Sequence, residues 1–277
     1  MNSKAVTPAT SFLFTVNEEA TQLDHWKSKV FHSTTAKLLY IMQRARPDIK
    51  TAVSFLMKHV SKRIIDDWKK LRWVIGFLKG TINELRVIGA TSLMEILTFI
   101  DSAYAVHANC RSHTGGLSSF GIGTVHARSK SWKINVKSST ESELVAASEY
   151  LPHTLWLRYF MIAQGYEIKD NMVYQDNKSA IQMEIKGRNS CTGNSRHINI
   201  RYFWVKDRVK NEEVKIEYIP THLVLANFLS KHLQGERFRV LRAYIFFTKN
   251  LQGERFRVLR AYIMGWILMS DLFAQNY

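Results

Sequence analysis

Hydrophobic positions along the chain follow two different periods, and the change comes at about residue 94. From about residue 31 to residue 79, apolar residues recur at three- and four-residue spacing, which is typical of amphipathic helices. One such run is Ile49, Val53, Leu56 and Val60. Pro47 fits the first turn of a second helix, and Gly80 fits the end of a third. Residues 1–93 are therefore predicted to form a small all-helical subdomain of about three helices.

Residues 94–233 combine strand and helix patterns. Runs rich in β-branched and aromatic residues predict five strands, at 95–106, 120–126, 131–136, 172–175 and 214–219. Helices are predicted at 140–166, 179–186, 197–210 and 223–233. The first of these helices begins with Thr140 and Glu143 at capping-box spacing, and the pair Gly115-Gly116 is assigned to a turn. This order predicts an α/β domain in which helices flank a five-stranded mixed sheet.

The remaining residues, 234–277, are predicted to be a tail that contains an internal repeat. The segment Leu233–Ile245 (LQGERFRVLRAYI) recurs without change as Leu251–Ile263. Stacked repeats need at least three units for stability, and we know of no packing requirement that preserves such an identity. We therefore interpret the repeat as a recent tandem duplication whose second copy is an appendage.

The charge balance favours a polyanionic partner. The chain has 39 lysine and arginine residues against 23 aspartate and glutamate residues, a net charge of +16. Basic proteins bind nucleic acid by displacing the counterions of its phosphates. Lys130, Lys133, Lys137 and Arg201 are candidates for contacting a duplex, although the same residues would also suit a solvated surface.

The sequence predicts an intracellular protein, in the cytoplasm or the nucleus, without a membrane partner. The N-terminus lacks the basic start and apolar run of a secretory signal. The apolar stretch 261–268 is too short for a bilayer, which takes about 20 residues. Cys110 and Cys191 suggest neither a disulfide framework nor a metal site.

Three acidic residues occupy positions where an unused carboxylate is unfavourable. Asp101 lies inside the first predicted strand, Asp176 follows the fourth, and Glu143 is in the first turn of the long helix. A carboxylate in an apolar sheet is desolvated unless it is paired or binds a metal. If the first and fourth strands are neighbours, the three carboxylates meet, and such oxygen ligands select Mg²⁺ or Mn²⁺. Two ions about 3.5–4 Å apart would clamp a phosphodiester; the alternative is three unrelated surface acids.

Short motifs follow one another through the second half of the chain. They are Asp101-Ser-Ala-Tyr-Ala, Arg111-Ser-His-Thr-Gly-Gly, Ser138-Ser-Thr-Glu-Ser-Glu143-Leu, Tyr174-Gln-Asp176-Asn-Lys-Ser-Ala, Arg196-His-Ile and Leu225-Ala-Asn227-Phe-Leu-Ser-Lys231. In this order they resemble the ribonuclease H domain of copia-type (pseudovirus) retrotransposons. The upstream block Arg44-Ala-Arg-Pro-Asp-Ile49 is similar to the thumb and connection region of the reverse transcriptase. The resemblance covers nearly all of residues 7–245.

The resemblance implies hydrolysis of the RNA strand of RNA–DNA hybrids with two Mg²⁺ ions, for which Mn²⁺ can substitute. It assigns catalysis and metal binding to Asp101, Glu143 and Asp176, and it favours Glu143 over Glu141 because the family's glutamate directly precedes an aromatic or aliphatic residue. The fourth acid of the family falls at Asn227, which offers an oxygen without a charge and is expected to bind a second ion more weakly. The implied partners are RNA–DNA hybrids and other retroelement proteins.

Two other functions stay open. The chain lacks the Tyr-x-Asp-Asp hairpin of copia-type polymerases, so we expect no polymerisation by this chain alone. Together with Asn227 and the repeat, this absence favours an inactive retroelement remnant that only binds nucleic acid or other element proteins. An integrase-like nuclease would share the sheet and the acids, but the order of the motifs and the thumb-like block argue against it.

Overall fold

The first part of the chain is helical in the computed structural model, which describes residues 5–186 and 196–246. Helix α1 (His25–Arg44) is followed by the 3-10 turn η1 (Pro47–Ile49), α2 (Lys50–Lys58) and α3 (Ile65–Gly80). Asp24 begins α1 because its side chain accepts a hydrogen bond from Lys27 N at 2.8 Å. Asp67 stabilises the start of α3 by the reciprocal contact, because it is the third residue of the helix and accepts from Ile64 N at the N-cap at 3.1 Å. Three α-helices therefore lie between residues 25 and 80, within the range predicted to be helical.

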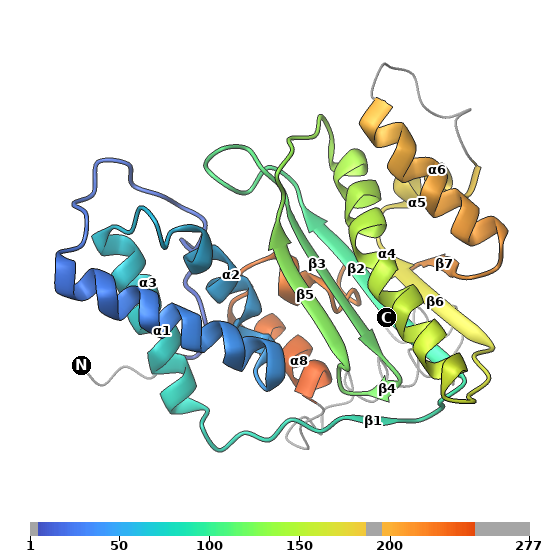
Figure 1. The fold of residues 1–277 in the computed structure, drawn as a ribbon, viewed down its shortest axis with the longest axis horizontal. Coiled ribbons are helices and arrows are strands. Elements are labelled where there is room, and N and C mark those ends of the chain that lie inside the picture. The colour runs from blue at the N-terminus through green and yellow to red at the C-terminus, as the bar shows by residue number, and fades with distance from the viewer. Residues whose placement is uncertain (1–4, 187–195, 247–277) are drawn as a thin grey trace, which may run out of the picture.

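A five-stranded mixed sheet forms the second part of the chain. Its strands are β2 (Glu95–Ala103), β3 (His113–Ser119), β5 (His126–Ser131), β6 (Asp170–Gln175) and β7 (Lys215–Tyr218). They lie in the order β5-β3-β2-β6-β7 (Figure 1). Strands β2, β3 and β5 are antiparallel neighbours, whereas β6 and β7 run parallel to β2. A separate short pair joins β1 (Gly89–Ala90) to β4 (Gly121–Ile122).

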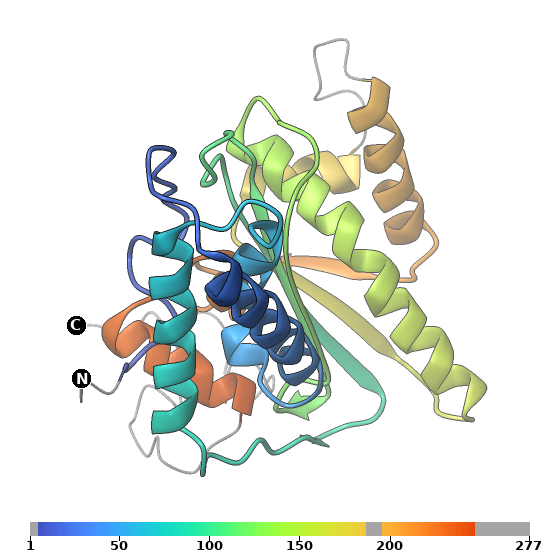
Figure 2. The same ribbon diagram turned by 60° about the vertical axis from the view of Figure 1, so that its left-hand side comes forward.

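Helices cover both faces of the sheet (Figures 1 and 2). One face packs against α4 (Ser139–Ala163), with α5 (Lys178–Lys186) and α6 (Arg196–Lys210) beside it. The other face packs against α2 and the short α7 (Asn227–Ser230), next to α8 (Gly235–Phe246). Side chains alternate along β2 accordingly: Ile100 is buried with α4, and Phe99 with the helices opposite. None of the helices in the described ranges is long and apolar enough to cross a membrane.

One hydrophobic core joins the helical region to the sheet. Phe31 of α1, Phe55 of α2, Phe99 of β2 and Phe238 of α8 belong to the same buried cluster. The boundaries predicted at residues 93 and 233 stay a prediction, but this core continues across both. Helix α8 contains most of the first copy of the repeat, whereas the second copy, 251–263, lies outside the described residues.

A buried ion-pair network also ties α8 to the helical region. The Asp48 carboxylate, which is 2% exposed, accepts from Arg46 at 2.8 Å and from Arg242 of α8 at 2.9 Å. Arg242 also pairs with Glu84. A buried carboxylate with two guanidinium partners is compensated in charge, and removal of one partner would leave a desolvated charge. The first copy of the repeat is therefore an integral part of the fold.

The second and third strands differ from the prediction at 120–126 and 131–136. The observed β3 and β5 begin earlier, and Gly115-Gly116 lies inside β3 and not in a turn. A Cβ atom on Gly115 would lie 2.5 Å from Ala226 O, and one on Gly116 would lie 2.2 Å from the Tyr150 ring. The two glycines are thus required by close packing on opposite faces of the sheet. The helix predicted at 223–233 is also wrong, since only the single turn α7 forms there.

Candidate metal centre

Strand pairing brings Asp101 and Asp176 together. Strands β2 and β6 are parallel, and Phe99 of β2 pairs with Tyr174 of β6. Asp101 and Asp176 each lie two residues beyond this pair, so their side chains emerge side by side on the face that carries Phe99 and Tyr174. The rings of Phe99 and Tyr174 stack at 5.1 Å between centroids, which supports this alignment. The neighbouring strands assumed in the sequence analysis are confirmed.

Helix α4 supplies Glu143. The helix is capped by Ser138 Oγ, which accepts from Glu141 N at 3.1 Å, and Glu141 Oε2 accepts from Lys137 N at 2.8 Å. The cap is therefore two residues before the predicted Thr140, and Glu141 is the acid that it uses. Glu143 is left free to turn toward the sheet, where its Oε1 accepts from Ser102 N at 3.1 Å.

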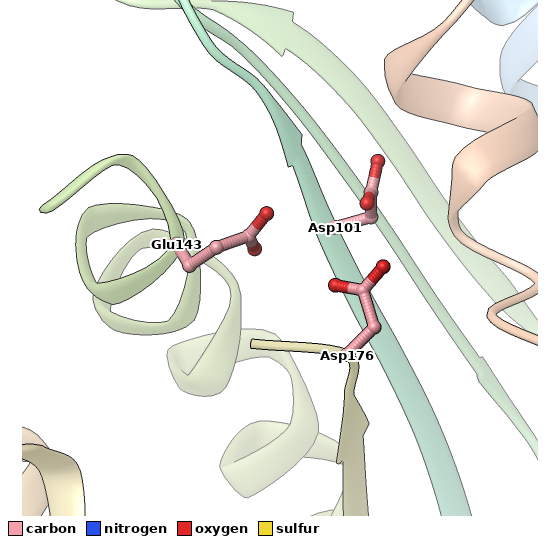
Figure 3. Close-up of side chains that lie close together, drawn as sticks. All are labelled: Asp101, Glu143 and Asp176. Carbon is pink, nitrogen blue, oxygen red and sulfur yellow. The ribbon is translucent and has the colours of Figure 1, made fainter. Parts of the chain in front are cut away.

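The three carboxylates form one cluster (Figure 3). Asp101, Glu143 and Asp176 each offer an oxygen, and these oxygens all lie within 4.8 Å of one another. Asp101 is 1% exposed and Glu143 is 6% exposed, whereas Asp176 is partly open to solvent. Across the described ranges, no other group of three acidic, histidine or cysteine side chains has this spacing. Residues that are 75 positions apart in the sequence thus meet at one point.

The cluster is electrostatically unfavourable without a cation. Burial, followed by the charges of Asp101 and Asp176, raises the pKa of Glu143 well above its ordinary value. Burial also raises the pKa of Asp101, against the lowering effect of Lys231 and Ser230. Glu143 Oε2 is buried and has no hydrogen-bond partner. An unpartnered oxygen beside two further carboxylates fits a hard divalent cation such as Mg²⁺ or Mn²⁺.

Asn227 lies beside the cluster and contacts it through a lysine. Lys231 Nζ is 3.1 Å from Asp101 Oδ1 and 2.5 Å from Asn227 Oδ1. Ser230 Oγ donates a hydrogen bond to the other oxygen of Asp101. The amide Nδ2 of Asn227 donates to Thr221 O at 2.7 Å and to the carbonyl oxygen of Val224 at 3.2 Å. That Asn227 itself binds a metal stays a prediction.

The roles of Ser230 and Lys231 were not inferred from the sequence. Both roles depend on the close packing of α7 against the sheet. This packing is so close that a Cβ on Gly115 would lie 2.6 Å from Ser230 N. Gly115 pairs with Asp101 across β2 and β3, so α7 approaches the sheet beside the aspartate. The four-residue spacing of Asn227 and Lys231 was the available signal, because such residues share one face of a helical turn.

The predicted nucleic-acid-binding residues divide into two pairs. Lys130 and Arg201 converge on Glu149 of α4, at 3.5 Å and 2.8 Å. Lys133 and Lys137 are exposed in the segment between β5 and α4. Lys130 of β5 pairs with Thr114 of β3, and Thr114 pairs with Ser102 of β2. Lys130 therefore lies level with Ser102, the neighbour of Asp101, but two strands away across the sheet. Contact of all four residues with a duplex stays a prediction.

No family model matches the chain. Over 217 residues it is 29% identical to the retrovirus-related Pol polyprotein from transposon TNT 1-94 of Nicotiana tabacum. Over 201 residues it is 23% identical to the corresponding polyprotein from transposon RE2 of Arabidopsis thaliana. Its homologues are Pol polyproteins of plant copia-type transposons. The matches cover 78% and 70% of this chain but only 16% and 13% of the Pol polyproteins, so they span about one sixth to one eighth of the length of those relatives.

One solved structure with some similarity is a ribonuclease H domain. It is the N-terminal ribonuclease H domain of Rv2228c from Mycobacterium tuberculosis, fused to maltose-binding protein, with a TM-score of 0.35 and 9% sequence identity. The match covers 50% of this chain and 91% of that one. The predicted fold class, a ribonuclease H-like mixed sheet of five strands flanked by helices, is confirmed by the observed sheet and its helical layers.

Proposed function

We propose that this chain is a metal-dependent ribonuclease H that hydrolyses the RNA strand of RNA–DNA hybrids. The observation that carries the proposal is the meeting of Asp101, Glu143 and Asp176 with oxygens within 4.8 Å of one another. An Mg²⁺ ion held there would supply Lewis-acid stabilisation of charge on a phosphodiester. The homology to Pol polyproteins and the order of the motifs support the choice of a hybrid as substrate.

The residues of the chain would share the work between holding the ion and positioning the duplex. Asp101 and Glu143 are buried, so their carboxylates exclude water from one side of the cluster. Asp176 is partly exposed and would face the substrate. Lys130, Lys133, Lys137 and Arg201 would contact the phosphates of the hybrid, in keeping with the net charge of +16. The match covers only 16% of the Pol polyprotein from transposon TNT 1-94, so any activity of the other regions of that protein falls outside this proposal.

The direct test is cleavage of a hybrid with a labelled RNA strand in Mg²⁺. We expect the wild-type chain to release shorter RNA, EDTA to abolish the release, and Asp176→Asn to lower the rate by at least about a hundredfold. Asp176 is preferred to Asp101 for this variant because its side chain does not hold Lys231. A duplex of two DNA strands should remain intact. Equal cleavage by the wild type and Asp176→Asn would contradict the proposal.

An inactive remnant that only binds nucleic acid is the second candidate, and one contact favours it. Lys231 Nζ lies between Asp101 and Asn227, where a cation already compensates part of the negative charge. In this case the wild type would bind a hybrid with the strong salt dependence of phosphate contacts. It would leave the RNA uncut in either Mg²⁺ or Mn²⁺, as would Asp176→Asn.

A further inference from the structure

The ammonium group of Lys231 lies on one side of the acidic cluster. Lys231 Nζ binds Asp101 Oδ1 at 3.1 Å and Asn227 Oδ1 at 2.5 Å, so a single ammonium bridges two of the four positions predicted to bind metal. The side chain of Lys231 is 37% exposed, whereas that of Asp101 is 1% exposed. Lys231 thus reaches from the surface to a buried carboxylate.

The other contacts of Asn227 hold its oxygen toward this lysine. Asn227 is fully buried, and its Nδ2 donates to the carbonyl oxygens of Thr221 and Val224. Reversal of the amide would place its oxygen against these two carbonyl oxygens, which is unfavourable. The Oδ1 atom of Asn227 is therefore oriented to accept from the lysine ammonium. A carboxylate at this position would meet the same two carbonyl oxygens, so the pocket is suited to an amide.

Lys231 neutralises only one side of the acidic cluster. The ammonium contacts one oxygen of Asp101, and Ser230 Oγ donates to the other. Glu143 Oε2 has no hydrogen-bond partner, and the Glu143 side chain points from α4 toward Asp101 and Asp176 (Figure 3). The cluster is thus neutralised on the α7 side and unpaired on the α4 side. A divalent cation would be drawn to the α4 side and repelled from the α7 side.

We propose, resting on the metal-dependent function above, that the Lys231 ammonium takes the place of a second metal ion, so that the cluster binds one divalent cation instead of two. The ion would be held by Glu143, Asp176 and Asp101, and Asp101 would at the same time stay paired with the lysine. Asn227 is then a positioning residue for Lys231 and not a weak metal ligand.

The test is a Mn²⁺ titration of the full chain, with free Mn²⁺ measured by electron paramagnetic resonance. Each protein is titrated with and without the additional substitution Asp101→Asn. The number of bound ions that this substitution removes is the number of ions assigned to the cluster. We expect one such ion in the wild type and two in Lys231→Met, with the first ion bound about tenfold or more tightly because a neighbouring positive charge is gone. Lys231→Arg, which keeps the charge, should bind one ion.

Controls separate this inference from the function on which it rests. Lys62→Met removes an exposed lysine in the loop after α2 and should leave the wild-type count unchanged. Lys231→Gln is a second neutral variant in case Lys231→Met does not fold, as judged by circular dichroism. Two Asp101-dependent ions in the wild type, or one in both neutral variants, would overturn the lysine assignment alone. No Asp101-dependent ion in any variant would overturn the metal centre as well.

Discussion

At the scale of single residues, the site places buried carboxylates within a few ångströms of a lysine ammonium. Glu143 and Asp101 are buried carboxylates whose raised pKa values show that their charged forms are disfavoured by burial. Lys231 and Ser230 stabilise the charged form of Asp101, but they make no such hydrogen bonds to Glu143. Asn227 lies at the position where the resemblance implies a fourth acid, and its side-chain nitrogen donates to two backbone carbonyl oxygens.

The structure predicts that Asn227→Asp does not simply restore an acidic site. The new carboxylate would lose two donated hydrogen bonds and face the carbonyl oxygens of Thr221 and Val224, although it would gain an ion pair with Lys231. We expect a net loss of about 1–3 kcal/mol in the free energy of unfolding. Urea denaturation of both proteins at neutral pH measures it. An increase in stability would contradict the packing described around this residue.

A second prediction at this scale concerns His113, which is 1% exposed. Its Nδ1 lies 3.1 Å from His107 Nε2, and its Nε2 lies 2.7 Å from Ser129 Oγ. Burial, and then the charges of His107 and Lys58, lower the pKa of His113 well below 6.5. Acid therefore protonates the unfolded chain first, so this stability is present above pH 6.5 and is lost as the pH falls toward the folded pKa.

We expect the His113→Gln variant to be less sensitive to acid than the wild type. Between pH 7.5 and pH 5.0 one fully buried neutral histidine accounts for about 2 kcal/mol of lost unfolding free energy. The difference between the two pH values, measured by urea denaturation, should shrink by about this amount in the variant. The same difference in both proteins would show that His113 titrates normally in the folded state.

At the scale of elements, the position of α7 depends on the glycine opposite it. A Cβ on Gly115 would lie within 2.8 Å of three backbone atoms of α7 and its N-terminal neighbour, none of which is a flexible side-chain end. Gly115→Ala should therefore push α7 from the sheet and destabilise the fold by about 1–3 kcal/mol or more. Gly80→Ala is the matched control, because nothing lies within 4 Å of its Cβ. Equal melting temperatures for the two variants would contradict this.

The sequence alone predicts the acidic cluster better than it predicts the strands. The acids at 101, 143 and 176 were found because each lies at a place where a strand or helix pattern makes a carboxylate unfavourable, and motif order supported the choice. The strands beside them were misplaced, since a glycine pair in a strand has the local signature of a turn. Only the packing of α7 and Tyr150 distinguishes the two cases. The role of Lys231 depends on the same tertiary contact.

At the scale of the whole molecule, the two copies of the repeat allow a test of whether both contribute to stability. Leu241 of α8 is 1% exposed, and Leu259 is its counterpart in the second copy. Leu241→Ala should lower the unfolding free energy by about 2–5 kcal/mol, as expected for a buried leucine. If the second copy is an appendage, Leu259→Ala should change it by less than about 0.5 kcal/mol. Thermal denaturation of both variants tests this, and similar losses would show that the second copy also packs.

The shared core has a further consequence for the molecule as a whole. Because Phe55, Phe99 and Phe238 lie in one buried cluster, the helical region, the sheet and α8 support one another. The acidic cluster depends on this arrangement through α7, which contacts both the sheet and α2. The acidic cluster is therefore held by a fold that spans both predicted regions.

The central claim is that Asp101, Glu143 and Asp176 bind a divalent cation together. Anomalous X-ray diffraction from crystals of the full chain soaked in Mn²⁺ tests it most directly, because it locates the ion without reference to activity. We predict an anomalous peak within about 2.5 Å of an oxygen from each of the three carboxylates, and no such peak in crystals of Asp176→Asn. Fully soaked crystals without a peak at the cluster, or with the same peak in Asp176→Asn, would contradict the account.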